Sequence, residues 1–282
     1  MALTQEQANL FASFEVRRAR EIDPPVLRGM SGPVVNGFED RNIIDLFVSD
    51  RYLQDDLNGH LASFVVMAPN GLPMLFFSLR CGELFERVDP EKMLAGRRFY
   101  DEIMVCMNNS QLSDEQKRAE IRLIAGRMQS EGLTIDDVME LTSKKQSIKA
   151  DEALEVNKDL TRVSEVHPAI EIKFLGKNAV ANSYWKSLGL PADKKMGETL
   201  FWTKVVDTIG LMMSMVGCEY VYLFAADNEA EGELVQYYRV RLNFDSNSKM
   251  SANKPHFDFQ SQFLFQSVKE LFAAQKAFME NF

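Results

Sequence analysis

The clearest pattern of hydrophobic and polar positions lies in the first third of the chain, where two apolar runs flank a turn. Leu61–Ala68 and Leu72–Cys81 are rich in β-branched, aromatic and other apolar residues, and Pro69-Asn70-Gly71 separates them. An Asn-Gly pair supplies the positive backbone angles that a tight antiparallel turn requires. The pattern therefore predicts a β-hairpin.

A further strand is indicated at Ala169–Leu175, where apolar and charged residues alternate. Period-two alternation is typical of a strand with one buried face. The two faces are expected to carry Ile170, Ile172 and Phe174 on one side and Glu171 and Lys173 on the other.

The remaining pattern predicts a mixture of helices and strands. Helices are expected at residues 3–22, 40–56 (intact or broken near Ser49), Thr199–Val216, Glu229–Arg241 and Val268–Met279. The Pro- and Gly-rich segment 23–37 is expected to be a loop. Further strands are expected at Glu219–Ala226 and His256–Leu264.

Residues 90–160 differ from the rest because glycine is sparse and charges recur at helical spacing. Ser113 and Gln116 form a capping-box pattern before an apolar stripe, and Thr134 is expected to cap another short helix. We interpret residues 88–166 as a helical insert of two to four helices within a single domain of residues 1–282. The predicted fold class is α/β, with a mixed twisted sheet flanked by helices.

Composition and charge narrow the function classes. The net charge of −9 disfavours broad binding to phosphate backbones, so nucleic acid is not an expected partner. Cys81, Cys106 and Cys218 are widely spaced and match neither a disulfide framework nor a metal-ligand pattern. No signal-peptide pattern or membrane-length apolar run is present, so a cytoplasmic location without membrane attachment is expected.

The order of elements and several short strings resemble the GNAT superfamily of acyl-CoA-dependent N-acetyltransferases. The strings are Ala169–Leu175, Lys194–Phe201, Val216–Ala226, Leu234–Tyr238 and Leu242–Phe244. The resemblance covers about residues 166–260, and the 61–81 hairpin supplies plausible preceding strands. It implies an acyl-CoA N-acyltransferase fold, acetyl-CoA as co-substrate and an amine as acceptor, with no metal.

The resemblance places a coenzyme A site at the helix that starts near Gly197. Small residues let backbone N–H groups approach a pyrophosphate, and the helix dipole favours its charge. Lys194 stands at the family's Gln/Arg position, while Thr199 replaces the second small residue. The binding residues implied are Phe174 and Leu175 beside the pantetheine arm, and Lys194, Lys195, Met196, Gly197, Glu198 and Thr199 at the phosphates. The alternative interpretation is an ordinary helix start.

Tyr238 matches the family tyrosine that protonates the departing thiolate, and a phenol can donate this proton without being charged. Asn243 replaces the family's usual glycine and tolerates a left-handed backbone. Packing in an amphipathic helix is the alternative role for Tyr237 and Tyr238.

Glu171 is the candidate base that takes a proton from the acceptor amine. The alternative is a solvated strand residue paired with Lys173, and His167 is a second candidate base. The resulting hypothesis is direct transfer of an acetyl group from acetyl-CoA to a small-molecule or peptide amine. A non-catalytic binding module with the insert as a docking surface is the alternative, and nothing in the sequence selects a toxin.

Overall fold

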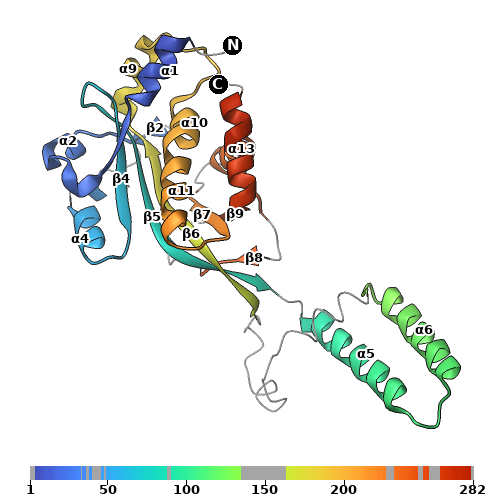
Figure 1. Cartoon of the computed structure of the whole chain (residues 1–282). Helices are drawn as coiled ribbons and strands as arrows, with labels where there is room; N and C mark the ends of the chain where they lie inside the picture. Colours follow the sequence, from blue (N-terminus) through green and yellow to red (C-terminus); the bar gives the residue numbers. More distant parts are fainter. Residues whose placement is uncertain are drawn as a thin grey trace. The chain divides into compact units, whose positions relative to one another are not determined.

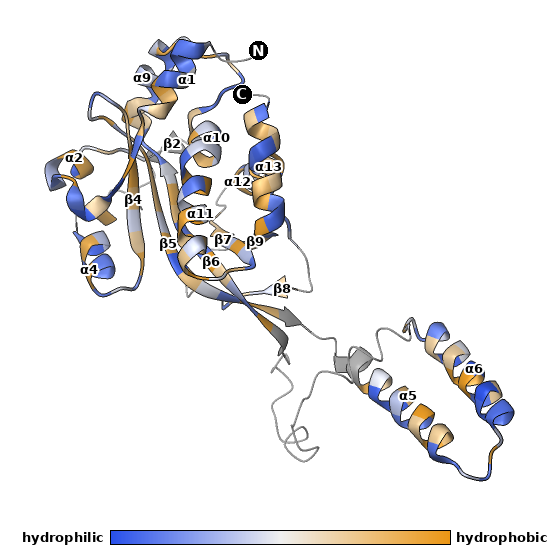
Figure 2. Cartoon of the chain, viewed as in Figure 1, coloured by the Kyte–Doolittle hydropathy of each residue, from blue (hydrophilic) through white to orange (hydrophobic). Residues whose placement is uncertain are grey.

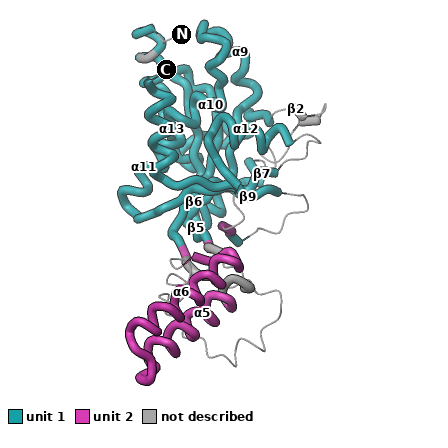
Figure 3. Tube along the Cα trace, turned by 90° about the vertical axis from the view of Figure 1, so that its right-hand side faces the viewer, with its two compact units in different colours: residues 1–84, 167–247, 252–282 teal, residues 85–166, 248–251 magenta. Residues whose placement is uncertain are grey.

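The computed structural model describes residues 4–32, 34–35, 38–39, 46–47, 49–87, 90–134, 163–226, 232–246, 250–253 and 261–280. The chain divides into two compact units (Figure 3). Residues 1–84, 167–247 and 252–282 form the first unit, and residues 85–166 and 248–251 form the second. Each unit has its own buried apolar residues.

A 7-stranded mixed sheet organises the fold, in the order β1-β4-β5-β6-β7-β9 with β8 paired to β5. The strands are β1 (Glu15–Arg18), β4 (Ala62–Met67), β5 (Pro73–Arg87), β6 (Val163–Lys177), β7 (Tyr220–Ala225), β8 (Met250–Ser251) and β9 (Gln262–Ser267). The pair β6/β7 is parallel, whereas β1/β4, β4/β5 and β7/β9 are antiparallel. Strands β2 (Val34–Val35) and β3 (Phe38–Glu39) form a separate two-stranded sheet. The predicted fold class is confirmed.

The predicted hairpin is confirmed as β4 and β5. Gly71 adopts a φ of 83°, and its amide donates to the carbonyl of Ala68. The side-chain oxygen of Asn70 accepts a hydrogen bond from the amide of Leu72 at 3.1 Å. Strand β5 continues past the predicted end at Cys81 to Arg87.

Two hydrophobic cores lie on opposite faces of the sheet, because successive residues of β4 and β5 alternate between them. Core 1 includes Phe64, Val66, Leu75 and Phe77, and core 2 includes Val65, Met67 and Phe76. Core 1 is covered by α1 (Gln5–Ala12), α9 (Asn182–Ser187), α10 (Met196–Leu200), α11 (Val206–Met215), α12 (Glu233–Arg241) and α13 (Val268–Glu280). Core 2 is covered by η1 (Ala19–Glu21), α2 (Pro24–Arg28) and α4 (Arg51–Leu57), which Figure 1 shows on the other side of the sheet. The hydropathy colours of Figure 2 show apolar residues along the strands between these layers.

The helix predicted at Thr199–Val216 is confirmed, with one irregularity. A π-helical segment, η3 (Phe201–Val205), joins α10 to α11. Both ends of the resulting helix bury side chains in core 1, including Met196 and Leu200 before η3 and Val206 and Ile209 after it. A π turn holds more residues than an α turn, so it changes which side chains face the sheet.

The alternation along β6 shifts by one residue. Ile170, Ile172 and Leu175 pack in core 1, whereas Phe174 packs in core 2 with its ring centroid 6.4 Å from that of Phe76. The expectation that Phe174 shares a face with Ile170 and Ile172 is therefore wrong. The side chains therefore change faces between Ile172 and Leu175, a shift that a period-two pattern cannot reveal.

In its described residues the second unit contains the helices α5 (Pro90–Asn108) and α6 (Asp114–Ser130), which pack around a small core of Phe99, Ile124, Met128 and Leu133. The predicted capping box is confirmed. Ser113 Oγ accepts from the amide of Gln116 at 3.3 Å, and Gln116 Oε1 accepts from the amide of Ser113 at 2.9 Å. The further helices expected after Thr134 lie outside the described residues. The boundaries 88–166 of the insert stay a prediction.

Two expectations for the first 60 residues need correction. The helix expected at 3–22 ends at Ala12, because Glu15–Arg18 pairs with β4 instead. Within the expected loop 23–37, Pro24–Arg28 is a short helix, and proline is favourable at its first positions. For residues 40–56, the alternative of a helix broken near Ser49 agrees with the structure: residues 46–47 are helical, Asp50 has a φ of 51°, and α4 begins at Arg51. Residues 40–45 and 48 lie outside the described part.

The elements predicted after residue 218 agree with the structure where its residues are described. The expected strand at Glu219–Ala226 and the terminal helix at Val268–Met279 are confirmed as β7 and α13. Helix α12 begins at Glu233, and residues 229–231 of the predicted helix lie outside the described part. Residues 256–260 of the strand expected at His256–Leu264 also lie outside the described part, and the strand is observed as β9 from Gln262. Among the described helices, none is long and apolar enough to cross a membrane.

Candidate functional site

A buried carboxylate lies at the centre of the sheet. Glu171 on β6 is 1% exposed, and its Oε2 accepts hydrogen bonds from Arg80 Nε at 2.6 Å and from the Tyr222 hydroxyl at 3.1 Å. Arg80 Nη2 lies 2.5 Å from the same oxygen. The other oxygen, Oε1, lies 3.8 Å from Lys173 Nζ. Ion pairing and hydrogen bonds offset the cost of burying a carboxylate here.

Neighbouring strands supply the partners of Glu171. Arg80 comes from β5, and Tyr222 lies opposite Glu171 in the parallel register of β6 and β7. Burial raises the pKa of Tyr222, and the charge of Glu171 raises it further, so the hydroxyl stays protonated and donates to the carboxylate. This arrangement differs from the solvated Glu171–Lys173 pair that the sequence left open, since Glu171 is buried and Arg80 is its closest partner.

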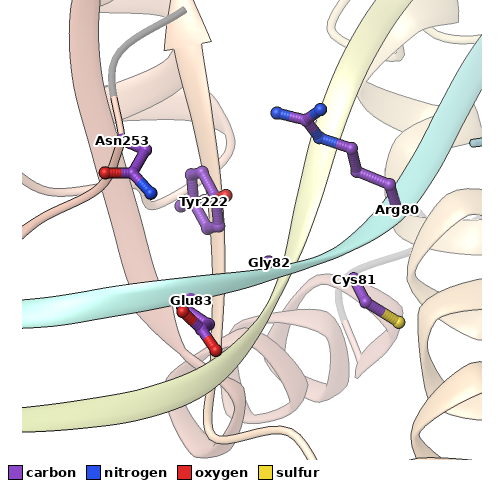
Figure 4. A pocket seen from close by; sticks show the side chains of 6 residues that line it. All are labelled: Arg80, Cys81, Gly82, Glu83, Tyr222 and Asn253. Atoms are coloured by element: carbon purple, nitrogen blue, oxygen red, sulfur yellow. The ribbon is translucent and has the colours of Figure 1, made fainter. Parts of the chain in front are cut away.

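Beside this cluster is a cavity of about 370 Å³ lined by Arg80, Cys81, Gly82, Glu83, Tyr222 and Asn253 (Figure 4). The Tyr222 side chain lies directly against the backbone of Gly82. A Cβ added at Gly82 would lie 2.9 Å from Tyr222 Cε1 and Cζ, and closer still to the hydroxyl oxygen. Only glycine admits the tyrosine in this position.

Gly82→Ala is therefore expected to destabilise the protein by about 1–3 kcal/mol, because the added methyl group displaces a buried tyrosine. Urea unfolding followed by tryptophan fluorescence measures the change. Gly217→Ala is the matched control, since a Cβ there meets open space, and its effect should stay below about 1 kcal/mol. Combined with Tyr222→Leu, the additional cost of Gly82→Ala should largely vanish. Equal costs with and without Tyr222 would show that the tyrosine is not what the methyl group meets.

The parallel pairing of β6 and β7 ends inside both strands. Their register runs from Ala169 opposite Tyr220 to Ile172 opposite Leu223. Beyond that point β6 continues to Lys177 out of register with β7, and β7 continues to Ala225 paired with β9. Phe174 and Leu175, predicted to flank a pantetheine arm, lie in this part of β6.

The predicted phosphate-binding residues begin α10. Among the described residues, no acceptor meets the backbone amides of Met196, Gly197 and Glu198, the first-turn donors of this helix. The Cα of Gly197 faces the Tyr237 hydroxyl, which would lie 3.1 Å from an added Cβ. Lys195, the N-cap residue, is exposed.

The other residues of this segment are mostly buried. Lys194 is 8% exposed; its carbonyl accepts from Trp185 Nε1 at 3.0 Å, and its ammonium lies 5.3 Å from the ring centroid of Phe278. Thr199 is fully buried. Burial raises the pKa of Glu198, whose Oε2 lies 3.9 Å from Arg241 Nη1. The guanidinium thus partly offsets the acidic charge at the helix start.

Tyr238 on α12 is buried in core 1, with its ring centroid 5.8 Å from that of Tyr237 and 6.3 Å from that of Phe244. Burial raises the pKa of Tyr238 to about 12. Within the described part of the chain no residue hydrogen-bonds its hydroxyl. Asn243 adopts a φ of 58°, the left-handed conformation expected at this position.

The predicted residues thus fall into two groups. Tyr238 shares core 1 with Leu175, Met196 and the start of α10. Glu171 alternates with the core 1 residue Ile170, so its side chain points to the opposite face, and the structure brings it into contact with Arg80 and Tyr222 instead. His167, the second candidate base, has its Nδ1 2.8 Å from Glu219 Oε2.

Sequence reasoning missed Arg80, Gly82 and Tyr222. A signal was present for the first two, because a charged residue and a glycine interrupt an otherwise apolar strand. No comparable signal marks Tyr222, which stands among other aromatic strand residues. Among the described residues, no group of three His, Cys, Asp or Glu side chains could hold a metal ion.

No protein-family model matches the sequence, and a search of curated proteins found no match. Solved structures similar to the chain include a bacterial toxin (TM-score 0.48, 9% identity, covering 93% of this chain and 96% of that chain). They also include AtaTR bound with AcCoA (0.46, 11%, 93% and 98%) and AtaT complexed with acetyl-methionyl-tRNAfMet (0.41, 9%, 93% and 98%). The chain is similar in structure to these proteins over most of its length.

Proposed function

We propose that this chain is an N-acyltransferase that moves an acetyl group from acetyl-CoA to an amine by direct attack. The observation that carries the proposal is the end of the β6/β7 register at Ile172 and Leu223, in the middle of both strands. Past this point the edge of β6 that faces β7 is free of the β7 ladder. Such an edge suits an extended ligand with amide groups, because main-chain hydrogen bonds can hold it as an added strand.

The pantetheine arm of coenzyme A is a ligand of this kind. In the proposal it runs past the backbone of Phe174 and Leu175, whose side chains are anchored in different cores. The two anchors fix the strand edge so that its backbone groups are preorganised.

The pyrophosphate is assigned to the start of α10. The amides of Met196, Gly197 and Glu198 supply donors, and the helix dipole and the exposed Lys195 supply positive potential. Glu198 opposes this, but its nearness to Arg241 and its raised pKa reduce the opposing charge. The residues present therefore fit the group.

Tyr238 is proposed to protonate the departing thiolate. Its pKa of about 12 keeps the phenol protonated at neutral pH, which a general acid needs. Glu171 is proposed to accept a proton from the amine through Oε1, since Arg80 and Tyr222 already occupy Oε2. Because Glu171 and Tyr238 lie on opposite faces of the sheet, the thioester is proposed to lie where β6 and β7 part, at the strand edge that both faces share. The acceptor is a small-molecule amine, a peptide N-terminus, a lysine or an aminoacyl-tRNA. The net charge of −9 makes the tRNA the least favoured of these.

The test of the cofactor is thermal stability with and without acetyl-CoA. A ligand that binds only the folded state stabilises it by about 2.7 kcal/mol at 100 times its Kd. Gly197→Asp should weaken acetyl-CoA binding at least about tenfold more than Gly197→Asn, because the two side chains match in size and differ in charge. Equal affinities for the two variants would place the pyrophosphate elsewhere.

The alternative function is a non-catalytic module that keeps the fold and uses residues 88–166 to dock a partner. It predicts acetyl-CoA binding without release of free thiol for any amine. A panel of amines, peptides and aminoacyl-tRNA, read out by thiol release, separates the two functions.

A further inference from the structure

We propose that Lys173 itself accepts an acetyl group from acetyl-CoA, so that the chain acetylates its own β6 strand. This inference rests on the proposed function, since it needs acetyl-CoA to bind along β6. It adds a modification site and a stoichiometric self-reaction to that function.

The position of Lys173 is the first argument. It follows Ile172, the last β6 residue in register with β7, and precedes Phe174 and Leu175, where the pantetheine arm is proposed to run. Its backbone therefore stands where the two strands part. The side chain is only 15% exposed, so bulk solvent does not surround the amine.

The second argument is the set of charges around the amine. Glu171 Oε1 lies 3.8 Å from Lys173 Nζ, while Glu171 Oε2 is held by Arg80 and Tyr222. The cations that face Lys173 are Arg80 from β5 and Arg51 from α4. Burial lowers the pKa of Lys173, and both arginines lower it further, whereas Glu171 raises it. A larger fraction of this amine is neutral, and hence nucleophilic, than of an exposed lysine.

The chemistry balances without a further reagent. The neutral Nζ attacks the thioester carbonyl carbon, an N–C bond forms, and the C–S bond breaks. The electron pair of the C–S bond leaves on the thiolate, which takes up a proton. The proton lost from Nζ goes to Glu171 Oε1 and then to solvent. The products are N-acetyl-lysine and free coenzyme A, one of each per chain, because the amide does not hydrolyse readily.

Lys204 on η3 offers a matched control. Burial also lowers its pKa, and Asp207 raises it, so it is a half-buried lysine with a carboxylate neighbour. It lies on the core 1 helix rather than on β6. Chemical acetylation that depends only on a lowered pKa should modify Lys173 and Lys204 alike, whereas reaction from a bound thioester should select Lys173.

The experiment is to incubate the purified full chain with acetyl-CoA at neutral pH and to follow each lysine by peptide mass spectrometry. We expect acetylation of Lys173 to approach one group per chain, with a rate that saturates with acetyl-CoA, while Lys204 stays unmodified. Glu171→Gln should slow the reaction at least about tenfold, since it removes the proton acceptor. Lys173→Arg should abolish it while retaining the charge beside Glu171. Acetyl phosphate, a donor without the pantetheine arm, should modify exposed lysines and spare Lys173.

Acetyl-CoA that binds saturably in the thermal-shift measurement, with Lys173 unmodified, would overturn the inference and leave the proposed function intact. Equal, non-saturating modification of Lys173 and Lys204 would also overturn it. Failure of acetyl-CoA to bind removes the proposed function, and the inference with it.

Discussion

Tyr238→Phe is expected to slow acetyl transfer by about 10²- to 10⁴-fold, the usual contribution of general acid–base assistance. Acetyl-CoA affinity should change little, because the buried ring stays in core 1 and loses only its hydroxyl. The measurement is thiol release under saturating acetyl-CoA with an acceptor from the amine panel, beside a thermal shift for binding.

Tyr237→Phe is the matched control for this prediction. The two tyrosines are neighbours on α12 with raised pKa values, but the Tyr237 hydroxyl lies against Gly197. Its loss should leave the rate of transfer within a few fold. Cys218→Ala should also remain active, because direct attack needs no acyl-enzyme. A fully active Tyr238→Phe enzyme together with an inactive Cys218→Ala enzyme would contradict direct transfer with this acid.

Arg80→Ala is expected to lower the free energy of unfolding by about 3 kcal/mol, because it leaves Glu171 buried without its cation. We take the lower end of the usual range, since the Arg80 side chain is 39% exposed and the Tyr222 hydroxyl remains. Urea unfolding followed by tryptophan fluorescence suits the measurement. Both tryptophans, Trp185 and Trp202, lie in the unit that contains this site.

Two further variants serve as controls for the Arg80→Ala measurement. Arg17→Ala removes an ion pair with Glu15 whose side chains are 54% and 59% exposed, and it should cost less than about 1 kcal/mol. Replacing Arg80 and Glu171 together by methionine should recover part of the stability, because the carboxylate and its guanidinium are removed together, while Lys173 and the Tyr222 hydroxyl lose Glu171 as a partner. An Arg80→Ala effect as small as that of Arg17→Ala would mean that the buried carboxylate does not depend on this guanidinium.

The sequence predicted the fold well where local pattern and tertiary packing agree. The β4–β5 hairpin has its turn residues, and β7 and α13 have the expected composition, so period and turn chemistry were sufficient. Prediction failed at Glu15–Arg18, where a helical pattern is overridden because the segment pairs with β4. It also failed at Phe174, because a shift in alternation along a strand leaves no mark on residue types.

The site was predictable only in part, for a similar reason. Glu171 stood out as a carboxylate within an apolar strand, but its partners, Arg80 and Tyr222, lie far from it in the sequence. Which residues meet across a sheet depends on register, and register is a property of the folded structure. The role of Gly82 became apparent only with the Tyr222 ring in place.

The π turn at Phe201–Val205 limits where insertions and deletions can be accepted in this chain during evolution. Deleting one residue there would permit a regular α-helix, but it would rotate the preceding turn by about 100° relative to α11. Met196 and Leu200 would then leave core 1, and the amides at the start of α10 would point elsewhere. Diverging relatives should therefore vary by substitution in this helix and accept insertions and deletions in other parts of the chain.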